Sequence, residues 1–326
     1  MARTIRTTCK IGACEPFCGI ELDVEDDAIV AVRPDRAHPI TRGYACVKGM
    51  HVPDYVNDLE RLLHPMKRDG GRRTRVAWST AIAEIGARLR AIRSMHGPTA
   101  IATYWGNAAD SVGITLANTF CHAFGSPNSF NVLSLEYTDR GAVAARVLGN
   151  ENLILQPDPT HSRFALLLGT NPVVTQGMTL LQRQPNVGAA LRGIRKRGGR
   201  VVVVDPRRTE TVRIADEHLP IRPGTDLFLL VAMIRRILES GRYDREFVGR
   251  HADGIDAWRM LVERLDLDRA ARVTGIERER IERGAGEIDA AVLSPGLPAG
   301  PPLQGVPNPP SGPPRGRKGI ARGHTR

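Results

Sequence analysis

The spacing of apolar residues predicts alternating helices and strands along most of the chain. Amphipathic helices are expected where apolar residues recur every three or four positions: 78–95, 114–120, the sequence leading to Gly198, 226–240 and 275–288. Short, mostly apolar runs predict strands at 100–104, 164–168, 201–204 and 218–222. Such alternation favours an α/β protein whose parallel sheet is covered by helices on both faces.

The two ends of the chain have different patterns. Residues 20–24 alternate apolar and polar positions, 25–27 supply a turn and 29–32 return, which predicts a β-hairpin. From 291 onward, 16 of 36 residues are Pro or Gly and no acidic residue remains, so this segment cannot bury enough apolar area to order itself. The expected division is a small β-rich domain at 1–62, an α/β region at 63–288 and a disordered tail at 289–326.

Composition and charge narrow the class of protein. The 326 residues are 41% hydrophobic and 25% charged, as in a soluble globular protein. No apolar run approaches the roughly 18 residues of a membrane helix, and the start lacks the pattern of a secretory signal. These features predict a cytoplasmic protein without membrane insertion. The net charge of +11 does not predict a nucleic-acid partner, because aromatic residues are only 5% and no basic stripe is present.

The cysteines predict a metal site. Four of the five lie near the start, in the pattern C-x4-C-x3-C-x27-C: Cys9, Cys14, Cys18 and Cys46. Clustered thiols in a cytosolic protein favour a metal over disulfides. Structural zinc sites usually contain C-x2-C pairs, which this chain lacks, whereas three close cysteines and a distant fourth suit a four-iron cluster. Zinc and free structural cysteines are the alternatives, and Cys121 is interpreted as a small buried residue.

Three loops follow predicted strands. Ligands of open α/β sheets bind beyond the carboxyl ends of the strands, so the loops at Gly106, Gly169 and Asp205 are interpreted together. Backbone N–H groups after Gly169 suit a pyrophosphate, and Asp205 suits ribose hydroxyls. Asp226 can accept two hydrogen bonds from a guanine edge, although Asp226 or its neighbour Thr225 is equally typical of a helix cap. No G-x-G-x-x-G follows a strand, so an NAD site is not expected.

These motifs together resemble the N-terminal part of the molybdopterin oxidoreductases of the dimethyl sulfoxide reductase and formate dehydrogenase type. The resemblance covers about 5–287 and differs from the family in its first cysteine gap, four residues instead of two. The cluster domain resembles the family at Thr8–Cys9, Cys14–Gly19, Arg33–Asp35, His38–Pro39 and Arg42–Gly49. A guanine-dinucleotide site resembles it at Gly169–Pro172, Val204–Thr209 and Pro220–Asp226.

The resemblance implies cofactors and residue roles. It implies a 4Fe–4S cluster on the four N-terminal cysteines, followed by an incomplete Rossmann-like region for molybdenum bis(molybdopterin guanine dinucleotide). Lys48 would relay electrons between cluster and pterin, the alternative being a solvated surface lysine. The cofactor-binding residues would be Gly106, Asn107, Gly169, Thr170, Asn171, Pro172, Asp205, Pro206, Arg207, Thr209, Gly224, Thr225 and Asp226.

The residues near the metal are the least defined part of the resemblance. The family places its molybdenum ligand in a loop after the helix that here ends near Phe124, and 125–140 contains no cysteine. Ser134 and Glu136 are the candidates there, with an ordinary polar loop as the alternative. The implied reaction is a two-electron oxidation or reduction of a small molecule, with an electron donor, acceptor or electron-transfer subunit as partner.

The length of the chain suggests a second hypothesis. The resembling enzymes continue for several hundred residues, so we expect a truncated or shifted reading frame after about 288, with a natural linker as the alternative. The competing function is a catalytically incompetent fragment that binds only an iron–sulfur cluster.

Overall fold

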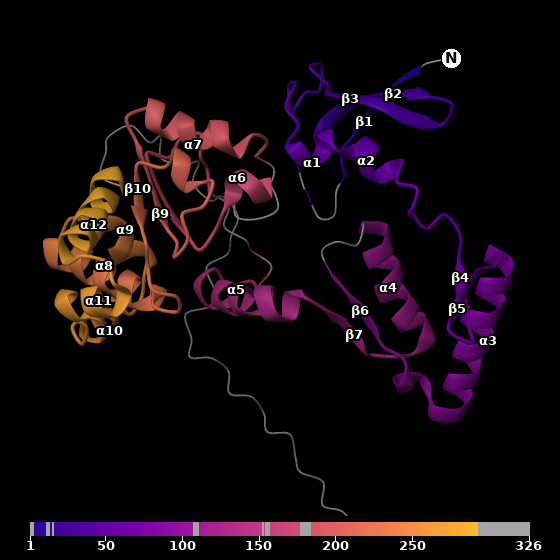
Figure 1. Cartoon of the computed structure of the whole chain (residues 1–326). Helices are drawn as coiled ribbons and strands as arrows, with labels where there is room; N and C mark the ends of the chain where they lie inside the picture. Colours follow the sequence, from indigo (N-terminus) through magenta and orange to yellow (C-terminus); the bar gives the residue numbers. More distant parts are fainter. Residues whose placement is uncertain are drawn as a thin grey trace, which may run out of the picture.

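The computed structural model describes residues 3–10, 14, 16–106, 111–151, 153, 157–176 and 184–292. Of 111, 133–136 and 289–292 it describes the backbone only. Figure 1 shows a small N-terminal β unit beside a C-terminal α/β unit, with a middle part of helices and short strands leading from one to the other. Asn107 and the tail from 293 onward lie outside the described residues.

The N-terminal unit is a three-stranded antiparallel sheet in the order β1-β2-β3. The predicted hairpin is confirmed as β2 (Gly19–Glu25) and β3 (Ala28–Pro34), joined by Asp26 and Asp27 in left-handed conformations. Strand β1 (Arg3–Thr8) pairs with β2 and was not predicted. Two short helices follow, α1 (Val47–Met50) and α2 (Val52–Val56). Ile20, Val52, Cys9 and Cys18 form the core of this unit.

In the middle part, the two predicted helices are present and one predicted strand begins later than expected. Its elements are β4 (Met66–Asp69), β5 (Arg72–Arg75), α3 (Trp78–His96), the 3-10 turn Pro98–Ala100, β6 (Thr103–Trp105), α4 (Ser111–Phe124), β7 (Ser129–Asn131) and α5 (Leu133–Val147). The strand expected at 100–104 begins only at Thr103, because Pro98 initiates a turn over Ala100. Strand β6 pairs in parallel with β7 in a separate two-stranded sheet.

The C-terminal unit contains the predicted parallel sheet. Its strands are β8 (Phe164–Leu168), β9 (Arg200–Val204) and β10 (Glu217–Leu219), in the order β10-β9-β8. Its helical elements are α6 (Pro172–Thr175), α7 (Val187–Lys196), the 3-10 turn Val212–Ile214, α8 (Asp226–Ser240), α9 (Arg245–His251), α10 (Ile255–Val262), α11 (Leu267–Thr274) and α12 (Arg278–Val292). The strands predicted at 164–168 and 201–204 are confirmed, the one predicted at 218–222 is Glu217–Leu219, and the one predicted at 100–104 is not part of this sheet.

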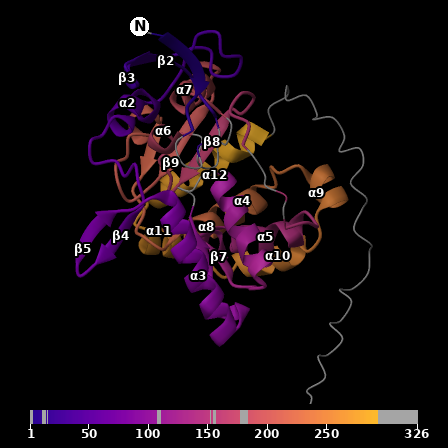
Figure 2. The ribbon, with the colours of Figure 1, turned by 90° about the vertical axis from the view of Figure 1, so that its right-hand side faces the viewer.

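Helices cover both faces of this sheet, as the alternating pattern predicted. On one face, Leu191 and Ile194 of α7 pack against Val201. On the other face, α8, α11 and α12 pack against Val202 and Val204. Figure 2 shows the molecule from the side on which α3 lies, with the C-terminal unit behind it. Within the described part of the chain, no helix is both long and apolar enough to span a membrane.

Candidate functional site

The four N-terminal cysteines gather around the start of β2. Cys9 follows β1, Cys14 and Cys18 lie in the loop before β2, and Cys46 precedes α1. The backbone N–H of Cys9 donates to the carbonyl of Cys18 at 2.7 Å, which closes the loop between them. Cys9, Cys14 and Cys18 are each only 8% exposed. None of the five cysteines forms a disulfide bond.

The electrostatics of Cys18 show that the four sulfur atoms influence one another. Burial, followed by the charges of Cys14, Cys46 and Cys9, raises the pKa of the Cys18 thiol to about 11. Four thiolates held together without a positive charge between them therefore repel one another. Iron would supply that charge, and its binding would release protons from the thiols.

A single zinc ion and a four-iron cluster require different separations of their sulfur ligands. A single zinc ion holds its sulfur ligands at about 2.3 Å, so the four sulfurs must lie close together. Among the described residues, no group of three or more His, Cys, Asp or Glu side chains has such an arrangement. A four-iron cluster instead takes its thiolates at the separate corners of a larger inorganic core.

Residues of the predicted motif brace the cysteine loop. Thr41 Oγ1 accepts from the backbone N–H of Gly19 at 3.1 Å, and the N–H of Asp35 donates to the Gly19 carbonyl at 2.9 Å. A Cβ atom on Gly19 would collide with the His38 side chain. On Gly49, a Cβ would lie 3.3 Å from Cys9 Sγ. These residues set the shape of the loop, a role that the spacing of the cysteines alone did not reveal.

The cysteine unit contacts the C-terminal unit at the end of α6. Lys48 Nζ donates to the Thr175 carbonyl at 3.4 Å, and the Tyr44 hydroxyl donates to Gln176 Oε1 at 3.1 Å. Lys48 is half-buried at this contact. Burial, followed by the thiolate charges of Cys46 and Cys18, raises the pKa of Tyr44 to about 12, so its hydroxyl keeps its proton at neutral pH.

The loops after β8 and β9 lie side by side, as expected. The backbone N–H of Gly169 donates to the Val204 carbonyl at 2.9 Å. Asn171 Oδ1 accepts from Thr211 Oγ1 at 2.7 Å, and its Nδ2 donates to Glu210 Oε2 at 2.6 Å. Asn171 therefore fastens the two loops together with its side chain, while Gly169, at a φ of +57°, turns the backbone and has open space around it.

Asp205 ends β9 as a buried carboxylate. Its Oδ1 accepts from the backbone N–H of Arg207 at 2.8 Å, and its carbonyl contacts His218 Nε2 at 2.8 Å. Thr209 is buried, and its Oγ1 accepts from the N–H of Val212. Pro206 and Arg207 are exposed at the end of the loop.

The loop before α8 lies at the same end of the sheet, since it follows β10. Gly224 has a φ of +78°. The Thr225 hydroxyl donates to the Arg222 carbonyl at 2.7 Å and does not cap the helix, although Thr225 occupies the cap position. Asp226 is half-buried in the first turn of α8.

Two sequence expectations for this site are wrong. Gly106 does not belong to the same sheet edge as Gly169 and Asp205, because β6 pairs with β7 rather than with β8 or β9. Ser134 and Glu136 do not lie in a loop, because both belong to the first turn of α5; their side chains are outside what the structure describes. Cys121 is buried as expected.

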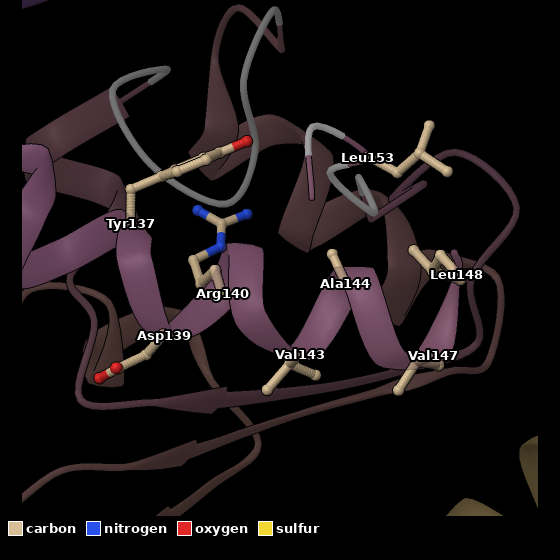
Figure 3. A pocket seen from close by; sticks show the side chains of 8 residues that line it. All are labelled: Tyr137, Asp139, Arg140, Val143, Ala144, Val147, Leu148 and Leu153. Carbon is tan, nitrogen blue, oxygen red and sulfur yellow. The ribbon is translucent and has the colours of Figure 1, made fainter. Parts of the chain in front are cut away.

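A cavity of about 360 Å³ lies along α5, one turn after Ser134 and Glu136. Most of its wall is aliphatic, and the Arg140 guanidinium lies 5.9 Å from the centre of the Tyr137 ring. Figure 3 shows both side chains on the same side of the helix. The lining residues are Tyr137, Asp139, Arg140, Val143, Ala144, Val147, Leu148 and Leu153. The sequence analysis missed this cavity because it assigned 125–140 to a loop and did not predict α5.

Comparison with known proteins gives two family matches. The molybdopterin oxidoreductase Fe4S4 domain matches residues 2–58, and the molybdopterin oxidoreductase family matches residues 61–296. A nitrate reductase of Symbiobacterium thermophilum is 28% identical over 87% of the chain and 38% of its own length. Formate dehydrogenase H of Escherichia coli is 30% identical over 83% of the chain and 38% of its own length.

A solved structure has the same fold. Acetylene hydratase from Pelobacter acetylenicus superposes with a TM-score of 0.71 at 25% identity, over 86% of this chain and 38% of that one. The chain thus spans about two fifths of the length of the relatives that it matches.

Proposed function

The chain belongs to the molybdopterin oxidoreductase family, and on this premise we propose that it binds its cluster and one nucleotide end of its cofactor to serve a two-electron redox reaction. The resemblance and the α/β fold expected from the sequence are confirmed. So are the two cofactor classes, a 4Fe–4S cluster and a molybdopterin cofactor. When bound, the molybdenum–pterin group supplies the two-electron exchange with the substrate.

We assign the cluster to Cys9, Cys14, Cys18 and Cys46. The observation that carries the whole proposal is that these four thiols, three of them buried, lie in a unit whose Lys48 and Tyr44 contact the end of α6. Helix α6 directly follows the loop from Gly169. The residues proposed for the cluster and for the nucleotide therefore lie on two sides of one contact, and we propose that Lys48, at this contact, relays electrons.

The nucleotide end is proposed to bind at the carboxyl edge of the three-stranded sheet. Backbone groups of Gly169 and Thr170 would face the pyrophosphate, and Asp205 the ribose. Asp226 would accept hydrogen bonds from the guanine edge, a role supported by its half-buried position and by the failure of Thr225 to cap the helix. Asn171 and Thr209 support these loops through hydrogen bonds with neighbouring residues. The remaining proposed cofactor-binding residues in these loops are Pro172, Pro206, Arg207 and Gly224.

The rest of the proposal concerns the surroundings of the site. We propose a domain boundary near residue 62. We also propose that the protein works in the reducing cytoplasm, where the four thiols stay reduced and available to iron. The matched proteins are named for nitrate, formate and acetylene. These differ in charge and shape, so we assign this chain only a small-molecule substrate, and an electron donor or acceptor as its partner.

A second candidate is a cluster-binding protein without redox catalysis. It is favoured by one observation, that the four thiols lie in a unit with a core of its own. Metal and nucleotide analysis of anaerobically purified protein separates the two. Iron near four per chain, with molybdenum and guanine nucleotide released by acid, supports the first function. Iron alone supports the second, and zinc in place of iron contradicts both.

Single substitutions test the cluster assignment. Cys14→Ser, Cys18→Ser and Cys46→Ser should each lower the iron content sharply, because a hydroxyl is a poor iron ligand. Cys121→Ser is the control, since Cys121 is also a buried cysteine but lies on α4. Iron at the wild-type level in any of the first three variants would refute the assignment.

Asp226 and Asp205 test the nucleotide site. Asp226→Ala should remove the preference for guanine over adenine, since two charge-assisted hydrogen bonds to a base contribute on the order of 3 kcal/mol. Asp205→Ala should weaken both nucleotides equally, because ribose is common to them. Guanosine and adenosine diphosphate titrations by calorimetry give the comparison. A guanine preference that persists in Asp226→Ala would assign that residue to the helix terminus alone.

A further inference from the structure

A hydrogen bond between two side chains that are far apart in the sequence crosses the contact between the N-terminal and C-terminal units. The Tyr44 hydroxyl donates to Gln176 Oε1 at 3.1 Å, across a separation of 132 residues. Tyr44 lies two positions before Cys46, and its ring packs against the core that contains Cys9 and Cys18. The position of Tyr44 is therefore tied to that of the cysteines.

Gln176 is held in an unusual conformation at the other end of this bond. Its φ of +55° and ψ of −133° lie in a region that residues with a Cβ rarely adopt. Its amide Nε2 donates to the carbonyl of Val173, one turn back in α6. This bond leaves Oε1 directed at the Tyr44 hydroxyl, so both ends of the amide have a partner of the correct kind.

Helix α6, whose C-cap is Gln176, is in turn held against the sheet. Helix α6 begins at Pro172, directly after Asn171, whose side chain binds Thr211 and Glu210 in the loop after β9. The Tyr44–Gln176 bond thus joins a segment tied to the cysteines to a segment tied to the strand-end loops. The Lys48 contact with the Thr175 carbonyl is adjacent but longer, at 3.4 Å.

We propose that Tyr44 and Gln176 form a latch that sets the position of the cluster unit against the strand-end loops. Both are positioning residues for electron transfer, because transfer between two redox groups slows steeply as their separation grows. The part that concerns electron transfer rests on the function proposed above. The part that concerns docking of the two units rests only on contacts within the chain.

A double-mutant cycle on the full chain tests the latch. Tyr44→Phe removes only the donor, and Gln176→Met keeps the length of the side chain but removes both the acceptor and the amide that donates to Val173. Each variant should raise amide hydrogen exchange at least tenfold in 44–50 and 172–176, and the double variant should not exceed Gln176→Met alone. Tyr55→Phe, a half-exposed tyrosine of α2 in the same unit, is the control and should leave exchange unchanged.

The midpoint potential and the electron paramagnetic resonance spectrum of the reduced cluster give the second readout. Iron content should stay at the wild-type level in both variants, while the potential shifts in the same direction in each, since solvent access to the cluster changes. A potential that shifts without a change in exchange would overturn the latch, as would additive effects in the cycle. If the wild-type chain holds no iron, the proposed function fails, and the exchange measurements still decide on the latch.

Discussion

The middle part of the chain, 57–151, and the C-terminal unit, 164–292, both contain amphipathic helices, but only the second buries them. Among the described side chains of the middle part, the buried apolar ones are Ile101, Cys121 and Ala144. Helix α3 is 19 residues long and has no buried residue. Helix α8 is 15 residues long and buries Leu229, Ala232 and Met233 against the sheet.

This difference teaches that helical periodicity predicts a helix but not a partner for it. The apolar residues Trp78, Ile82 and Ile85 recur along α3 at helical spacing, yet each is more than half exposed. In α8, the same kind of pattern meets the apolar strands β9 and β10, and the two surfaces exclude water together. The free energy of burial is therefore concentrated in the C-terminal unit.

The largest expected effect is a cavity in the better-packed region. Leu229→Ala should lower the free energy of unfolding by about 3 to 4 kcal/mol, because it removes a fully buried side chain between α8 and the sheet. Leu116→Ala on α4 is the matched control and should change it by less than about 0.5 kcal/mol, since Leu116 is well exposed. Urea unfolding followed by circular dichroism measures both; equal losses would erase the contrast between the two regions.

Ion pairs should also stabilise the C-terminal unit more than the middle part, but with a smaller effect on the unfolding free energy than the Leu229 cavity. Glu217 is 12% exposed and accepts from Arg280 at 2.9 Å and from Arg283 at 3.0 Å. Burial raises its pKa, but the hydrogen bonds from these two arginines outweigh burial and hold the pKa below the ordinary 4.5. A lowered pKa in the folded state means that Glu217 stabilises the protein above pH 4.5 and loses this effect as the pH falls through its folded pKa.

Glu217→Gln should therefore cost about 2 kcal/mol of unfolding free energy at pH 7, and progressively less in acid. Glu84→Gln is the control from the middle part, where the Lys67–Glu84 pair is exposed; exposed pairs contribute little. Thermal unfolding between pH 3 and pH 7 gives the comparison. If Glu217→Gln lowered the unfolding free energy equally at every pH, the effect would come from altered packing rather than from the loss of charge.

The neighbouring Glu287 should behave in the opposite sense. Burial, only partly offset by Arg200, raises the pKa of Glu287, and its Oε2 is buried without a hydrogen-bond partner among the described residues. A raised pKa favours the protonated form on folding, so its contribution to stability is present below pH 4.5 and is lost as the pH rises through the folded pKa.

Glu287→Gln imitates the protonated form. It should stabilise the protein at pH 7, by less than Glu217→Gln destabilises it, and leave stability unchanged near pH 4. Glu282→Gln on the same helix, where the side chain pairs with Arg278, is the control. Destabilisation at pH 7 would show that the bond to Arg200 outweighs the burial of the charge.

The sequence predicted the features that depend on neighbouring residues, and it did not predict those that depend on contacts between distant segments. Strands β8 and β9 and helix α8 were predicted because their apolar runs and the Thr225–Asp226 start are local signals. Strand β1 was missed because Arg3–Thr8 is an edge strand with mostly exposed side chains. Gly106 was assigned to the wrong sheet edge because pairing of strands depends on distant segments. The Tyr44–Gln176 contact has no periodic signal in the sequence, since it joins a loop to the residue that ends α6.

The smallest expected effect on stability belongs to α3. A double variant, Ile82→Ser with Ile85→Ser, should change the unfolding free energy by no more than about 1 kcal/mol, because two exposed side chains lose no packing. The same variant should lower the binding of an apolar fluorescent dye and reduce association, since exposed apolar patches favour both. Ile194→Ser on α7, where the side chain is fully buried against β9, is the matched comparison and should unfold a large fraction of the protein. If the α3 double variant were as damaging as Ile194→Ser, the middle part would have a core that its exposure does not reveal.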